Sequence, residues 1–146
     1  MAQTEHLPIY KATYDLCLYF EQIVRNFSRY HKYALGQELR DGARRVLKLI
    51  VRANARRDKT NVLLQIREEV EQLKVLLRLC HDAKGFANFN SFEHSVRLVT
   101  DIAKQNEGWL KSQRGCPPED RGHDGTEGRG QNRRVILAEV AEPSVP

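Results

Sequence analysis

Eight cations between positions 40 and 59 are the residues of this sequence whose types and spacing best suit chemistry. They are Arg40, Arg44, Arg45, Lys48, Arg52, Arg56, Arg57 and Lys59. Most of them recur every four residues, so on a helix they form a ridge opposite the apolar Leu39, Val46 and Ile50. The ridge would be about 24 Å long by the helical rise per residue. Such a row of cations matches nucleic-acid phosphates, which it binds with release of counterions and without reading the base sequence.

A helix face rich in charge is also typical of a surface that meets only solvent, and the sequence leaves this alternative open. Lys48, Arg52 and Arg56 have no Asp or Glu three or four positions before them, whereas Asp41 can pair with Arg44 or Arg45. Because unpaired like charges repel one another, the pattern favours an anionic ligand. No aromatic residue is interleaved with the cations, so stacking on bases is not expected.

Motifs for catalysis are missing from the sequence. It contains no phosphate-binding G-x-x-x-x-G-K-[ST] loop, no G-x-S-x-G nucleophile turn and no H-E-x-x-H zinc motif. It also lacks the Glu-x-x-His pairs of a di-iron bundle. Cys80, His81 and Asp82 adjoin one another, but consecutive residues of a helix point about 100° apart and cannot converge on one atom. We therefore expect no enzyme activity, no metal and no cofactor.

The composition is that of a globular protein with one core. The chain has 146 residues, a formal net charge of +5 and 40% hydrophobic residues. Residues 2–6 lack the features of a signal peptide, and no apolar run is long enough to cross a bilayer. The cysteines Cys17, Cys80 and Cys116 are odd in number and widely spaced, which favours a reducing compartment. We expect a cytoplasmic protein without a membrane span.

Apolar residues at alternating steps of three and four predict four amphipathic helices. We expect them over Pro8 to Arg29, Leu35 to Arg56, Asn61 to Ala83, and from Asn90 onward. Their connectors are short, so successive helices must run antiparallel. The sequence thus predicts an all-α fold, an up-down-up-down four-helix bundle.

Details of the helices are predicted from single residues. The apolar stripe of the first helix extends to Tyr30, and Gly36 and Gly42 should weaken the start of the second. The third helix should end with Gly85 as the glycine after its C-cap. Asn90 with Glu93 three residues later forms a capping-box pattern at the start of the fourth.

A sharp change of composition separates two regions. Residues 1–113 carry the helical periodicity, whereas 114–146 begin with a stretch rich in Gly, Pro and charge that we expect to be a disordered tail. Within the tail, Val135 to Val140 is apolar enough to dock as a short strand or peptide, or it is loose like the rest.

Two parts of the sequence carry a resemblance to a known family. They are Val62 to Asp82, with Leu77-Arg78-Leu79-Cys80-His81-Asp82, and Phe92-Glu93-His94 through Gly108-Trp109-Leu110-Lys111-Ser112. Over about Leu7 to Gln113 the chain resembles the accessory variability determinant (Avd) family of diversity-generating retroelements. Its family-like positions are Arg78, His81, Asp82, Trp109 and Lys111, which serve packing or partner contact. Glu107 departs from the pattern, which would have a glycine there.

The resemblance implies a four-helix bundle that is not catalytic. It further implies a homopentamer that binds the element's reverse transcriptase and its template RNA, or DNA, and supports mutagenic copying into cDNA. A bundle family encoded in ribosomal-RNA intervening sequences shares the fold. The alternative to an accessory subunit is therefore a structural oligomerisation module whose basic face is merely solvated.

Overall fold

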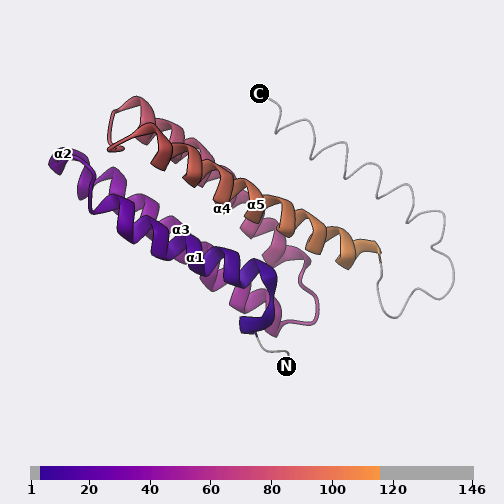
Figure 1. Ribbon diagram of the computed structural model, residues 1–146. Coiled ribbons are helices and arrows are strands. Elements are labelled where there is room, and N and C mark those ends of the chain that lie inside the picture. Colours follow the sequence, from indigo (N-terminus) through magenta and orange to yellow (C-terminus); the bar gives the residue numbers. More distant parts are fainter. Residues whose placement is uncertain (1–3, 116–146) are drawn as a thin grey trace, which may run out of the picture.

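The computed structural model describes residues 4–115. After a short 3-10 turn η1 (Thr4–His6), the helices are α1 (Pro8–Val24), α2 (Arg29–Lys32), α3 (Leu35–Ala55), α4 (Thr60–Asp82) and α5 (Phe89–Gly115). The four long helices α1, α3, α4 and α5 lie along one another in a bundle (Figure 1). This confirms the predicted all-α bundle, although α5 continues two residues past the expected boundary at 113. Predictions for 116–146, including the segment 135–140, lie outside the described residues.

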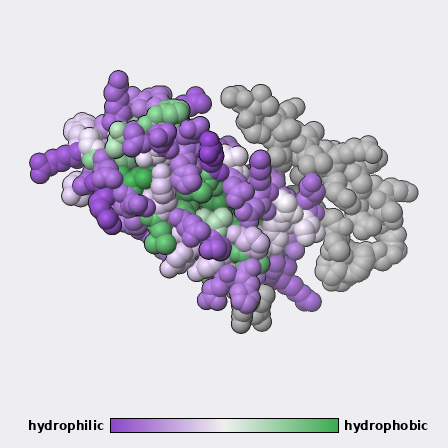
Figure 2. Space-filling model, in the orientation of Figure 1, coloured by the Kyte–Doolittle hydropathy of each residue, from purple (hydrophilic) through white to green (hydrophobic). Residues whose placement is uncertain are grey.

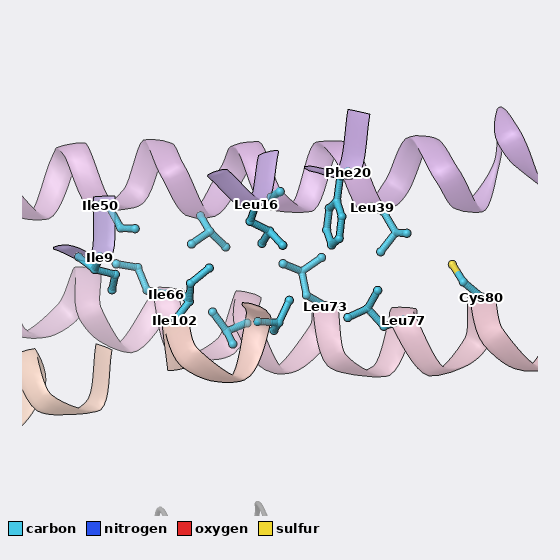
Figure 3. Packing of buried hydrophobic residues seen from close by; sticks show 14 of the residues in the cluster. Ile9, Leu16, Phe20, Leu39, Ile50, Ile66, Leu73, Leu77, Cys80 and Ile102 are labelled. Atoms are coloured by element: carbon cyan, nitrogen blue, oxygen red, sulfur yellow. The ribbon is translucent and has the colours of Figure 1, made fainter. Parts of the chain in front are cut away.

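The core lies along the axis of the bundle, where the apolar stripes of the four long helices meet. The stripes follow the spacing read from the sequence, that of α1 as far as Phe27, and most large apolar side chains on them are almost completely buried. Figure 3 shows many of them, among them Ile9, Leu16, Phe20, Leu39, Ile50, Ile66, Leu73, Leu77 and Ile102. Full burial of one such side chain stabilises the fold by about 1.5–3 kcal/mol before the entropy cost of folding is subtracted. Mutual burial therefore holds helices that carry little capping of their own.

The first helix is shorter than predicted, and Tyr30 is not part of the core. The chain leaves α1 through tight turns in which Phe27 N–H donates to the carbonyl oxygen of Val24. These turns direct Phe27 inward, where it is buried and meets Phe86 edge to face at 5.1 Å between ring centroids. Tyr30 follows in the short α2 and is 85% exposed. In the sequence the apolar spacing continues as far as Tyr30, but the helix itself ends at Val24.

At two glycines, Gly36 and Gly42, α3 packs closely against its neighbours. A Cβ at Gly36 would lie 2.6 Å from Val24 Cγ1 of α1, and one at Gly42 would lie 2.8 Å from Leu73 Cδ2 of α4. Both glycines are buried. Helix propensity alone predicts that both glycines weaken the start of α3, and the structure adds that the missing side chains allow this close contact with α1 and α4.

The junction between α4 and α5 uses different residues from those predicted. Lys84, not Gly85, adopts the left-handed conformation, with φ of 63°. Gly85 N–H then donates to the carbonyl oxygen of Cys80 over 2.9 Å, closing the helix end. At the start of α5 the side chain of Asn88 accepts from Ser91 N–H at 2.8 Å, so Asn88 replaces the expected cap at Asn90.

In the described part of the chain, no helix combines the length and the apolar character that a bilayer crossing requires.

We expect Gly36→Ala to lower the free energy of unfolding by about 1 kcal/mol. Crowding against the fully buried, β-branched Val24 costs about 1–3 kcal/mol and outweighs a gain of about 1 kcal/mol in helix propensity. Urea unfolding followed by far-UV circular dichroism measures the change. Gly108→Ala is the matched control, because a Cβ there meets nothing within 4 Å, and it should raise stability by about 0.5–1 kcal/mol. Equal stabilisation by both substitutions would contradict the close approach at Gly36.

Candidate nucleic-acid interface

The cations in the first part of the predicted ridge form ion pairs with α1. Arg40 Nη1 and Arg44 Nη1 each lie 3.4 Å from a carboxylate oxygen of Glu21, so one acidic residue contacts two ridge cations. Arg44 also contacts Asp41 at 3.2 Å, which is the pairing anticipated within the helix. Arg40 and Arg44 are therefore less available to an external anion than the sequence suggested.

Arg45 forms the corresponding contact on the other side of α3. Its Nε donates to Glu69 Oε1 of α4 over 3.1 Å. Glu21 and Glu69 were missed by sequence reasoning, because nothing in the sequence fixes which helices are neighbours or how they are aligned. Three ridge cations thus brace α3 against the helices on either side of it.

The last part of the ridge carries the cations that remain available. The side chains of Lys48, Arg52, Arg56 and Arg57 are exposed, and no ion pair or hydrogen bond joins them to another residue within the described range 4–115. We call these four residues the exposed cation cluster. From Lys48 to Arg56 the helical rise gives a length of about 12 Å, half that of the predicted ridge.

The exposed cation cluster is held by an ordered end of α3. Arg56 is the C-cap of this helix, and its backbone N–H donates to Ala53. Lys59, the eighth predicted cation, donates from its Nζ to the carbonyl oxygen of Arg56 and from its backbone N–H to Gln113 Oε1 of α5 at 3.4 Å. Lys59 therefore serves mainly to fix the exit of α3. The cluster presents positive charge near the negative end of a helix dipole, which the cations also stabilise.

The family-like positions do not come together in one site. His81 lies at the end of α4, where its ring stacks on Phe92 at 4.2 Å between centroids, and the adjacent Asp82 is exposed. Trp109 and Lys111 lie on the last turns of α5, at the opposite end of the bundle (Figure 1). Arg78 is exposed on α4. These positions cannot form a joint catalytic centre.

Trp109 is half-buried and packs against the core, as expected for a residue with a packing role. Among the described residues, no three His, Cys, Asp or Glu side chains are grouped so that they could hold a metal ion.

Neither of the two described cysteines has a reactive thiol. Burial raises the pKa of the Cys80 thiol to about 12, and the charge of Glu38 adds to this effect. Burial likewise raises the pKa of Cys17 to about 11, although the nearby Arg44 opposes the shift. At neutral pH both groups are thiols and not thiolates, so neither is suited to act as a nucleophile.

Alkylation with iodoacetamide at pH 8 should therefore modify Cys80 at least about 100-fold more slowly in the folded chain than in the urea-unfolded chain. Peptide mass spectrometry separates the sites. Folding raises the pKa of both thiols, so they contribute to the stability of the folded state while the pH is below the pKa of the unfolded cysteines. This contribution should decline as the pH rises from about 9 toward 12. Rapid alkylation of Cys80 in the folded protein would show that the α4 end opens readily.

Comparison with known proteins adds one match. A family model described as bAvd-like covers residues 7–113, which span the whole of the bundle from the residue before α1 to near the end of α5. No curated protein matches the chain.

Proposed function

The chain belongs to the bAvd-like family, and on that premise we propose that it is a non-catalytic accessory subunit of a diversity-generating retroelement. In this role it binds the element's reverse transcriptase and template RNA and supports mutagenic cDNA synthesis. The chemistry of copying belongs to the polymerase, so the accessory chain needs binding surfaces and no reactive groups.

The observation that carries the RNA part of this proposal is the exposed cation cluster. Its four side chains lie on one ordered helix end and have no anionic partner among residues 4–115. Cations placed in this way can contact phosphates of successive nucleotides with release of counterions. No aromatic residue lies among them, so binding should depend on backbone charge and hardly on base identity.

Assembly into a ring would multiply this surface. We propose a homo-oligomer, a pentamer on the basis of the family resemblance, so that several cation clusters engage one RNA. Linked weak contacts raise the overall affinity through effective concentration. The ordered α3 end makes the geometry of each cluster reproducible from copy to copy.

A second candidate has its own support in the ion pairs of the ridge. Arg40, Arg44 and Arg45 brace the bundle, so much of the positive charge on α3 has a structural role. The chain would then be an oligomerisation module of the intervening-sequence type, and its remaining cations would only be solvated. A reverse transcriptase gene beside the coding sequence, flanked by near-identical repeats, would distinguish the accessory subunit from this alternative.

Reversing three cluster charges tests the RNA proposal. The triple variant Lys48→Glu, Arg52→Glu, Arg56→Glu should keep its helical circular dichroism and lose at least about tenfold in affinity for a single-stranded RNA at physiological salt. Fluorescence anisotropy measures the affinity.

The matched control reverses Arg25, Arg97 and Lys104, which are exposed cations outside α3. It changes the net charge by the same amount and should bind RNA within about threefold of the wild type, because counterion release depends on local contacts. Equal losses in both variants would mean that only net charge matters, and unchanged binding by the cluster variant would overturn the proposed interface.

Light scattering on the purified chain tests the assembly. We expect a particle mass close to five times the 16.9 kDa of the chain. A monomer or dimer that is indifferent to RNA would remove both the ring and the accessory role, and would leave only the bundle.

A further inference from the structure

A groove of about 630 Å³ lies between α3 and α4, on the outside of the bundle. It extends along α4 from Glu68 to Leu79, a length of about 16 Å by the helical rise. Among the described residues, its lining comes from these two helices alone. The groove lies outside the core and contains no residue of the exposed cation cluster.

The groove has an apolar strip along α4. Val75 is 70% exposed and Leu79 is 50% exposed, and the half-buried Leu76 lies beside them. Gly42 of α3 and Leu73 of α4 also line the groove and are in close contact, since a Cβ at Gly42 would lie 2.8 Å from Leu73 Cδ2. Exposure of clustered aliphatic side chains to water is unfavourable in free energy unless another apolar group covers them. On the face of the molecule drawn in Figure 2, hydrophilic residues dominate and apolar patches lie between them.

The rim of the groove is strongly acidic. Five carboxylates and one guanidinium line it. Glu69 contacts Arg45, and Glu71 contacts Lys74 at 3.2 Å. The side chains of Glu38 and Glu68, one from each helix, have no ion pair or hydrogen bond within residues 4–115. The groove therefore fits a peptide that combines cations with aliphatic residues.

The chain itself contains a segment with this chemistry. Residues 133–138 read Arg-Arg-Val-Ile-Leu-Ala, two cations followed directly by three large aliphatic residues. Six extended residues span about 20 Å, which is close to the length of the groove. We propose that the groove between α3 and α4 is a docking site for residues 133–138 of the same chain. Arg133 and Arg134 would meet Glu38 and Glu68, and Val135 to Leu137 would cover the apolar strip.

The position of the end of α5 makes this docking reachable. Helix α5 runs antiparallel to α4, because Asn106 donates to the carbonyl oxygen of Leu63 and Gln113 accepts from Lys59. The end of α5 therefore lies beside the start of α4, about 21 Å along the helix from the middle of the groove at Leu73. Residues 116–132 number 17, and a random-coil chain of that length has a root-mean-square span of about 23 Å. A connection whose span matches the gap gives the highest effective concentration.

Cross-linking in the full chain tests the docking. A photoreactive benzoylphenylalanine replaces Val75, and the tryptic peptides joined to it are identified by mass spectrometry. The expected partner is the peptide that begins at Val135. Mixing isotopically labelled and unlabelled chains distinguishes a link within one chain from a link between copies. Links between copies, links to other helices, or no link to the peptide from Val135 would each overturn the proposal.

Charge exchange supplies the control for specificity. Arg133→Glu with Arg134→Glu should lower the cross-link yield at least fivefold, counted in this variant on the tryptic peptide that begins at Gly130, because the cleavage site before Val135 is lost. Arg121→Glu with Arg129→Glu changes the net charge equally and should leave the yield unaltered. Adding Glu38→Arg and Glu68→Arg to the first pair should restore at least half of the yield. Equal yields in all variants, or no recovery in the exchanged chain that retains its helical circular dichroism, would show that the carboxylates do not hold this segment.

Discussion

The close approach of α3 to both of its neighbours is the constraint on which the rest of the molecule depends. Gly36 and Gly42 let α3 approach α1 and α4 closely, because any side chain at either position would overlap a buried aliphatic group. At that separation the ion pairs to Glu21 and Glu69 can form. Helix packing therefore decides which cations of α3 are used inside the bundle and which remain available outside it.

Helix α3 consequently presents two different surfaces. Its last turns and the two residues that follow them carry the exposed cation cluster, which suits phosphates, whereas its earlier turns form one wall of an acidic groove with an apolar strip. The opposite charges would direct the proposed RNA and the proposed basic segment to separate surfaces. Membership of the bAvd-like family supports the accessory role that the exposed cation cluster would serve.

The sequence was most informative where a feature depends on one helix alone. The apolar spacing of α4 is unbroken, and its prediction as a helix over Asn61 to Ala83 differs by one residue at each end from the observed Thr60–Asp82. The ends were harder to predict, since Lys84 takes a conformation that glycine was expected to take. Glu21 could not be assigned to the ridge at all, because its contact with Arg40 depends on the alignment of α1 with α3. Features that join two helices thus required the structure.

The most direct test of the account is the RNA affinity of the wild-type chain measured across a salt series. Four cations that each release counterions from a single strand predict that the logarithm of the association constant falls with the logarithm of salt concentration, with a slope of about −3 for one cluster and steeper for several. A slope close to zero, or no binding at low salt, would contradict the central claim that the exposed cation cluster binds nucleic-acid phosphates.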